Sequence, residues 1–173
     1  MIFAIPYDNS TLQPPINILK SADVVYLLWS AKLSSSASPT KADMINNAGN
    51  LLDNNVSPIQ TQVGKPFVIG LTYPSASYSA TGCIPSGNGG CLDWKILSRP
   101  NADISSVNID LQQQVDIYDA MFNAINARSW VSGIVSRGYF QPVTLQDKSA
   151  SVYGKPASDL LWYWFPRLLG NIK

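Results

Sequence analysis

The sequence predicts an α/β fold in which four strand–helix units build a parallel sheet. Four continuous apolar runs are typical of strands that are covered on both faces. Segments with helical spacing of their apolar residues separate and follow these runs. Strands that alternate with helices are joined by right-handed crossovers, and this makes the sheet parallel. The strands are expected at residues 2–7, 23–29, 66–73 and 130–139.

The first two helices are expected from proline and N-cap signals. Pro14 and Pro15 can open a short helix that ends near Lys20. Ser38 and Pro39 suit the N-cap and the first helical position of a second helix, which should reach about residue 52.

The third helix, at about residues 110–128, has the clearest pattern because its apolar residues recur every three or four positions. Asp110 at its start and Arg128 in its last turn suit the helix dipole. The fourth helix should begin near Pro156 and be disturbed at Pro166. Its two tryptophans, Trp162 and Trp164, are expected to pack against apolar neighbours.

Length and composition limit the function classes. The 173 residues suit a single domain, 1–173, with a long loop insertion at 74–108. Only 13% of the residues are charged and the net charge is +1, so we expect no nucleic-acid partner and no membrane span. The chain has no His and no Glu, which excludes histidine metal sites, Ser-His catalysis and a pair of catalytic Glu residues. We expect no metal and no cofactor.

Cys83 and Cys91 are separated by seven residues that include Gly87, Gly89 and Gly90. This short flexible segment favours a local disulfide, with two free loop thiols as the alternative. A disulfide would indicate an oxidising compartment and a secreted or extracellular parent protein. The first ten residues, MIFAIPYDNS, do not have the pattern of a signal peptide.

Several segments resemble the C-terminal half of a (β/α)8-barrel glycoside hydrolase. GKPFVIGLTYPSA resembles the seventh strand of such a barrel, and WVSGIVSRGYF after DLQQQVDIYDAMFNAINAR resembles its eighth strand after the seventh helix. DKSASVYGKPASDLLWYW resembles the closing loop and helix, and IFAIPYD and VVYLLWSAKL then correspond to strands five and six. The resemblance implies half of a TIM-type barrel, since a complete barrel needs about 250 residues. We expect a second copy, as a homo-oligomer, or a missing N-terminal half to complete it.

The resemblance implies a hydrolase that acts on or binds carbohydrate at the carboxyl ends of the strands. Members of the Glu-Glu clan carry a catalytic Glu at the end of strand seven, but here Leu71, Thr72 and Tyr73 stand at that point. Asp8 and Asp147 are therefore the candidate catalytic pair, because two carboxylates can share acid and base roles. The alternative is that both residues stabilise turns.

Aromatic and polar side chains at the expected strand ends are candidates for carbohydrate binding. A ring can cover the C–H face of a sugar while neighbouring polar groups bind its hydroxyls. For Trp29 and Tyr139, packing within the barrel or against a helix is the alternative to sugar binding. Two other function classes stay open: a non-catalytic fragment or assembly module, and an unrelated doubly wound domain. The candidate sugar-binding residues are Tyr26, Trp29, Lys32, Thr72, Tyr73, Ser75, Arg137 and Tyr139.

Overall fold

The computed structural model of the chain describes residues 1–8, 13–100, 104–141 and 143–170. Its four strands form one parallel sheet in the sequential order β1-β2-β3-β4. Each strand pairs with the next in sequence, so the order has no reversal point and the doubly wound alternative is wrong. The strands are β1 (Ile2–Tyr7), β2 (Val24–Trp29), β3 (Phe67–Leu71) and β4 (Val131–Ser136).

In the described ranges, five α-helices connect or follow the strands. A π-helical turn, Leu52–Val56, joins the second helix to the third, and two 3-10 turns, Ser79–Thr81 and Trp94–Leu97, lie in the long connection after β3. The α-helices are α1 (Ile16–Lys20), α2 (Lys41–Leu51), α3 (Ser57–Val63), α4 (Leu111–Asn126) and α5 (Ala157–Leu168).

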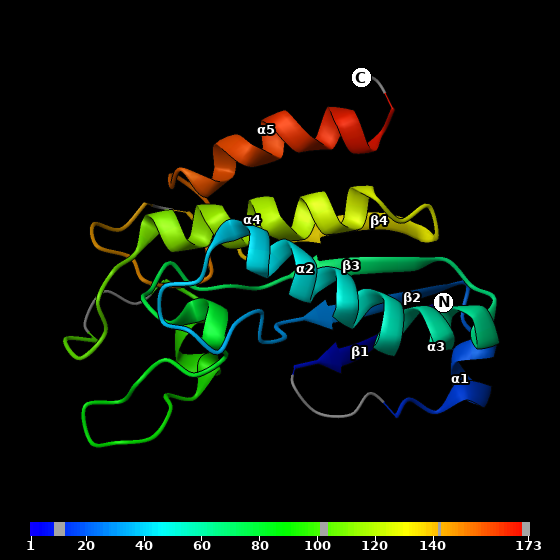
Figure 1. The fold of residues 1–173 in the computed structure, drawn as a ribbon, viewed down its shortest axis with the longest axis horizontal. Helices are drawn as coiled ribbons and strands as arrows, with labels where there is room; N and C mark the ends of the chain where they lie inside the picture. Colours follow the sequence, from blue (N-terminus) through cyan, green and yellow to red (C-terminus); the bar gives the residue numbers. More distant parts are fainter. Residues whose placement is uncertain (9–12, 101–103, 142, 171–173) are drawn as a thin grey trace.

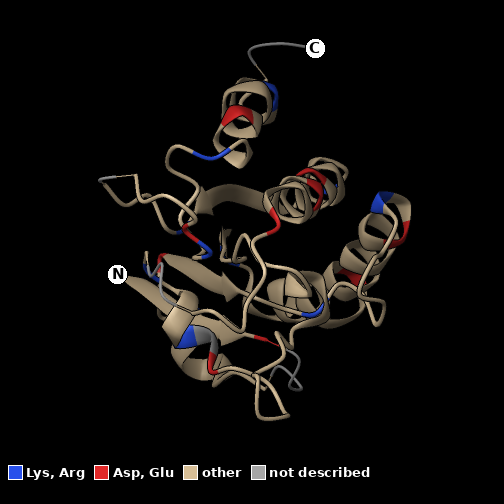
Figure 2. Ribbon diagram, turned by 90° about the vertical axis from the view of Figure 1, so that its left-hand side faces the viewer, with Lys and Arg blue, Asp and Glu red and all other residues tan. Residues whose placement is uncertain are grey.

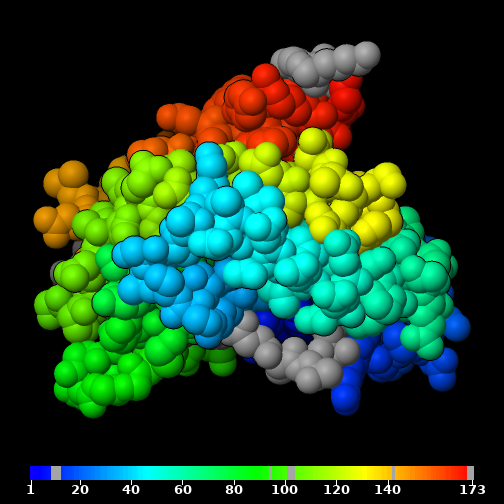
Figure 3. All heavy atoms as spheres, viewed as in Figure 1, coloured from blue at the N-terminus to red at the C-terminus, as the bar shows by residue number. Residues whose placement is uncertain are grey.

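The helices lie on one side of the sheet. In Figure 1, α2, α3 and α4 lie in front of the strands, and Figure 2 shows the two layers from the side. The space-filling view in Figure 3 shows α2 and α3 as a continuous cover over this face. All four strands point the same way, so the strand-to-helix connections gather at one end of the sheet.

The core lies between this helix layer and the sheet. Alternate residues of each strand point to the helices, and those of the two central strands are fully buried. They pack in one cluster with Tyr118 and Phe122 of α4 and Trp164 of α5. The buried residues of the central strands are Val25, Leu27, Trp29, Phe67, Ile69 and Leu71.

The opposite face of the sheet is apolar but uncovered in the described part of the chain. Ile2 and Val135 are 69% and 41% exposed, and Ala4 is exposed as well. The sequence predicts strands that are covered on both faces, and the described part of the chain covers one of those faces.

Three helices differ from the sequence prediction, and one of them, α3, was not predicted. The N-cap of α2 is Thr40 rather than Ser38, because the Thr40 Oγ1 accepts the backbone N–H of Asp43 at 3.1 Å. The last helix runs through Pro166 to Leu168, so the proline removes one backbone donor without ending the helix.

The two tryptophans of α5 also have different environments. Trp164 is buried, as predicted, and its Nε1 donates to Asp119 Oδ1 at 2.8 Å. Trp162 is 83% exposed, so its predicted packing is wrong. Positions two apart on a helix point to nearly opposite sides, and only one of them can face α4. Within the described ranges, no helix has the length and apolar character that crossing a membrane requires.

A cavity at the carboxyl ends of the strands

A cavity of about 380 Å³ lies at the carboxyl ends of β1, β2 and β3. One wall comes from residues that directly follow these strands: Asp8, Ser30 and Thr72, with Tyr73 and Pro74. The other wall comes from the long connection between β3 and α4, which contributes Ser79, Gly82, Ile84, Leu92 and Leu97. The cavity therefore combines polar strand ends with a largely apolar loop wall.

The sheet register explains why Asp8, Ser30 and Thr72 lie side by side. Each residue follows the last paired position of its strand, and the backbone ladder continues into this row. The N–H of Ser30 donates to the Tyr7 carbonyl at 2.9 Å, and the N–H of Thr72 donates to the Trp29 carbonyl at 3.0 Å. Since side chains alternate along a strand, this row points away from the helix side to which Tyr7 and Trp29 point.

Thr72 is the unusual member of this row. Its side chain is buried, yet its Oγ1 has no hydrogen-bond partner among the described residues. A buried hydroxyl without a partner costs about 1–3 kcal/mol, and native proteins contain few of them. Thr72 lines the cavity but its Oγ1 is fully buried, so a rotation of the side chain is needed to bring this hydroxyl to a polar group of a bound ligand.

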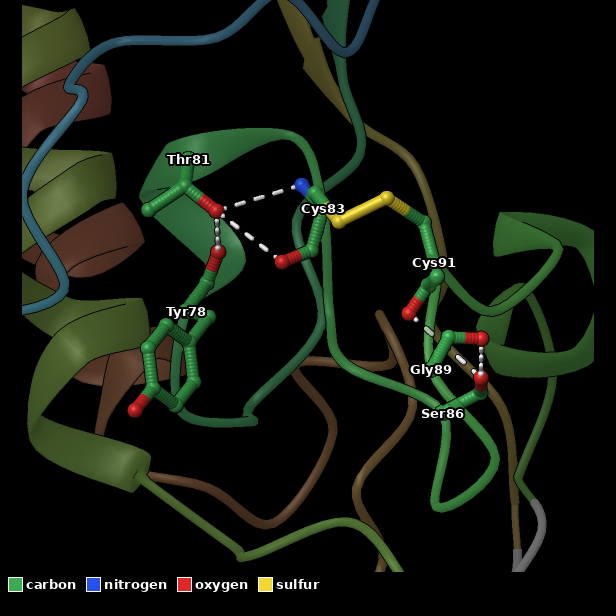
Figure 4. Close-up of a disulfide and its surroundings, with 7 residues drawn as sticks. Tyr78, Thr81, Cys83, Ser86, Gly89 and Cys91 are labelled. Carbon is green, nitrogen blue, oxygen red and sulfur yellow. Dashed lines mark hydrogen bonds between the residues drawn. A yellow bond between two sulfur atoms is a disulfide. The ribbon is translucent and has the colours of Figure 1, made fainter.

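The loop wall of the cavity is held by the disulfide between Cys83 and Cys91, whose Cα atoms are 5.0 Å apart (Figure 4). The backbone of Pro85 pairs with that of Cys91, which brings the two sides of the loop together. The Thr81 hydroxyl accepts the N–H of Cys83 at 3.2 Å and donates to the Tyr78 carbonyl at 2.8 Å. The structure therefore contains the predicted disulfide, and the bond fixes the segment that presents Ile84 and Leu92 to the cavity.

Asp147 lies in a buried ion pair and is not among the residues that line the cavity of Asp8. Its Oδ2 is 2.9 Å from Lys155 Nζ, and both residues are buried. Lys155 Nζ also donates to Ser75 Oγ at 2.8 Å and to the Ser149 carbonyl at 2.8 Å. The Ser75 hydroxyl in turn donates to the Asp147 carbonyl at 2.8 Å. This network engages the Asp147 carboxylate and the Ser75 hydroxyl in contacts within the chain, and these contacts stabilise the loops after β3 and β4.

Opposing influences act on the pKa of the Asp147 carboxyl. Burial raises this pKa, but hydrogen bonds from the Ser149 backbone and from Lys155 outweigh burial and hold the pKa below its usual value. The carboxylate is therefore charged at neutral pH. A carboxylate in this state, surrounded by protein donors, suits an ion pair better than proton transfer to a ligand.

Trp29 and Tyr73 form a second internal pair. Trp29 Nε1 donates to the Tyr73 hydroxyl at 2.7 Å, and this hydroxyl donates to the Ala31 carbonyl at 2.6 Å. Trp29 is fully buried on the helix side and packs edge-to-face on Tyr7. The fully buried Trp29 ring therefore agrees with the core-packing alternative and not with a sugar contact. Tyr73 lines the cavity, although its hydroxyl is already used.

Tyr26 and Arg137 are placed together near the uncovered face of the sheet. The Tyr26 side chain lies over Gly70 of the neighbouring strand, where any Cβ would collide with its hydroxyl. Burial raises the pKa of Tyr26, and the nearby positive charge of Arg137 opposes that change. These two residues do not line the described cavity.

Lys32 and Tyr139 lie elsewhere at the surface. Lys32 lines a shallow depression with Leu33 and Asn47. Tyr139 is exposed and packs edge-to-face on Tyr153, with ring centroids 4.7 Å apart. The structure therefore brings Asp8, Thr72 and Tyr73 together in one cavity and distributes the other candidate residues over separate environments.

The apolar loop residues of the cavity, Ile84, Leu92 and Leu97, were not among the predicted site residues. They belong to the insertion at 74–108, which follows a strand of a parallel sheet and therefore lies at its carboxyl end. That position is a signal for the loop as a whole. It does not identify which loop residues point inward.

The chain matches no protein-family model and no curated protein sequence. It does match solved structures of TIM-barrel glycoside hydrolases. A GH113 β-1,4-mannanase complex superposes with a TM-score of 0.64 at 21% identity, covering 95% of this chain and 44% of that chain. A second GH113 β-1,4-mannanase structure gives 0.59 at 24% identity, with 94% and 44% covered. The GH113 β-mannanase AaManA from Alicyclobacillus acidocaldarius, in complex with ManMIm, gives 0.56 at 17% identity, with 96% and 45% covered.

This chain thus spans less than half the length of the solved barrels that it resembles. Four sequential parallel strands with alternating helices, matched over nearly the whole chain, make the fold half of a TIM-type barrel. The expected glycoside hydrolase-like architecture is confirmed.

Proposed function

We propose that this chain binds carbohydrate in the cavity lined by Asp8, Ser30 and Thr72. The observation that carries the proposal is the buried Thr72 hydroxyl, which lines the cavity and has no hydrogen-bond partner in the described part of the chain. A sugar offers hydroxyl groups that can both donate and accept, and one of them would satisfy Thr72 once its side chain turns the buried hydroxyl towards the cavity.

The chemistry of the two walls supports a sugar more than a purely apolar or a charged ligand. Asp8 and Ser30 add polar groups beside Thr72, while Ile84 and Leu92 face the cavity with apolar side chains. Sugars have polar hydroxyl edges and apolar C–H faces, so a cavity of this mixed character suits them. The fold shared with structures named as β-1,4-mannanases suggests β-1,4-linked mannose as the first ligand to test.

Binding is a better proposal for this chain than hydrolysis. Glycoside hydrolysis generally needs two carboxyl groups on either side of the scissile bond. Asp8 is the carboxylate among the described lining residues of the cavity, and Asp147 is held in its ion pair with Lys155. Asp8 alone can bind sugar hydroxyls as an acceptor.

Isothermal titration with β-1,4-mannotetraose tests the proposal. Thr72→Val removes the hydroxyl at nearly constant volume, and we expect about tenfold weaker binding from the loss of one hydrogen bond. Thr61→Val is the matched control because Thr61 is exposed on α3, and its affinity should equal that of the wild type. Equal affinity of the Thr72→Val variant, or no binding of mannotetraose by the wild type, would overturn the proposal.

A hydrolysis screen distinguishes the binding proposal from the enzyme alternative. The chain is incubated with mannan, cellulose and other glycans, and released sugars are measured by chromatography. We expect no product. Release of sugars that disappears in an Asp8→Asn variant would establish hydrolysis instead.

We also propose that the chain works in an oxidising, extracellular environment. Disulfides persist in such compartments and are rare where thiols are kept reduced. The bond between Cys83 and Cys91 supports this placement. Thiol titration of natively purified protein should find no reactive cysteine, and two reactive thiols per chain would contradict the proposal.

A further inference from the structure

We propose that two copies of this chain associate through their open strand edges and uncovered sheet faces to close an eight-stranded barrel. The proposal depends on the fold and stands independently of the carbohydrate proposal. Four features of the described residues support it: the two sheet edges, the uncovered face, a groove beside β4, and the relation between the two edges.

Neither edge of the sheet has a partner strand among the residues that the structure describes. Within the described residues, β1 pairs with β2 alone and β4 pairs with β3 alone. The Met1 and Tyr7 carbonyls accept the N–H groups of Asp23 and Ser30, which flank β2, so the alternate residues Ile2 and Ala4 direct their peptide groups to the open side. Pro6 on the same side offers a carbonyl but no donor. An exposed edge of an apolar strand is a template for pairing with another strand.

The uncovered sheet face consists mainly of apolar residues, with the Tyr26 side chain lying over Gly70. The register aligns residues of all four strands on this face, and none of them carries a charge. Its outer members Ile2 and Val135 are among the exposed large hydrophobic residues of the chain. In a closed barrel, these side chains fill the interior in layers. The aligned residues are Ile2, Ala4, Pro6, Val24, Tyr26, Leu28, Val68, Gly70, Gly133 and Val135.

A groove of about 660 Å³ runs beside β4 and α5. It is lined by Val135 of β4 and by Leu161, Trp162 and Leu169 around α5. Trp162 and Leu169 are exposed, an unfavourable state for such large apolar side chains. A strand that paired with β4, together with the helix after it, would cover this groove. At the far edge of the sheet, α1 follows β1 and exposes Ile18.

The relation between the two edges suits a second copy as the occupant. All strands are parallel, so a two-fold rotation about the barrel axis pairs β4 of each copy with β1 of the other. The same rotation places α1 and Ile18 of one copy beside the groove of the other. Two copies with four strands each supply the eight strands of a TIM barrel. The match to this chain covers only 44% of the solved barrel chain, which leaves room for a second set of four strands. The net charge of +1 offers little repulsion between copies.

Sedimentation velocity between about 0.1 and 50 µM tests the proposal. We expect a species of twice 18.8 kDa. Val135→Lys should weaken the dimer at least about 100-fold, because it buries an unpaired charge in the barrel interior. Trp162→Ala should weaken it about 30-fold through loss of an aromatic anchor. Both side chains are exposed in a single copy, so circular dichroism should be unchanged.

Thr61→Lys adds the same charge on the helix side and is the control; it should sediment like the wild type. A wild-type chain that is folded and monomeric at about 50 µM would overturn the proposal. Larger, polydisperse species would overturn closure by two copies. A dimer that resists both Val135→Lys and Trp162→Ala would show that the copies associate through another surface.

Discussion

Lys155 and Asp147 form an ion pair, 2.9 Å between Nζ and Oδ2, that is buried among loop residues at the carboxyl end of the sheet. Lys155 lies just before α5, Asp147 lies in the loop after β4, and the Lys155 ammonium also reaches Ser75 in the loop after β3. The pair therefore joins the two loops that follow the last two strands, and it fixes the approach of the chain to α5.

Replacing Asp147 should destabilise the fold. Asp147→Asn leaves Lys155 as a buried charge without a counterion, and breaking such a pair costs about 3–5 kcal/mol. Urea unfolding of the variant should show this loss. The double variant Asp147→Asn, Lys155→Met removes both charges and should recover part of the stability. A single variant as stable as the wild type would show that the ion pair has no structural role.

The same pair predicts a dependence of stability on acid pH. The folded-state pKa of Asp147 is lowered below its usual 3.8, so its stabilising contribution is complete above pH 3.8 and is lost as the pH falls through the lower folded-state value. Urea unfolding from pH 7 to 2 should show the difference between wild type and Asp147→Asn shrinking below about pH 3.8. A difference that stays constant down to pH 2 would contradict this.

Thr72→Val should stabilise the ligand-free chain while it weakens carbohydrate binding. The substitution removes a buried hydroxyl that has no partner in the described structure, so the free energy of unfolding should rise by about 1 kcal/mol. Urea unfolding measures this gain, and the exposed Thr61→Val control should change stability by less than about 0.5 kcal/mol. A loss of stability in Thr72→Val would indicate that the hydroxyl already has a partner in the free protein.

Reduction of the disulfide should destabilise the loop wall of the cavity. Cys83 and Cys91 are eight positions apart, and closing a loop of this length is worth about 2.5 kcal/mol in the chain-entropy description. Thermal unfolding with and without a reductant measures the loss, and a Cys83→Ser, Cys91→Ser variant should reproduce it and ignore the reductant. Equal unfolding temperatures in all four samples would contradict a stabilising role.

The sequence predicted the strands and their order because buried parallel strands leave continuous apolar runs. The start of a helix is harder to predict where two neighbouring residues are both suitable N-caps. Ser38 and Thr40 are both good N-caps, and Asp43, three positions after Thr40, favours the second. The disulfide was predictable because its two cysteines are close in sequence.

The site depended on contacts that local sequence does not encode. Ser149, two positions after Asp147, donates to its carboxylate, which agrees with the turn role kept as the alternative. The contact between Lys155 and Ser75 spans 80 positions, and no local pattern indicates it. Trp29 is the last residue of an apolar strand and resembles a strand-end aromatic that could contact a sugar, but the side on which it falls depends on the register with β3. The same register places Thr72 in the cavity.

The most direct test of the central claim, that the cavity at the strand ends binds carbohydrate, is a titration of ¹⁵N-labelled chain with β-1,4-mannotetraose followed by amide chemical shifts. The account predicts shifts that cluster at Asp8, Ser30, Thr72, Gly82 and Leu92 and that weaken in Thr72→Val. An unchanged spectrum at saturating sugar, or shifts confined to the groove around Tyr139 and Trp162, would contradict it.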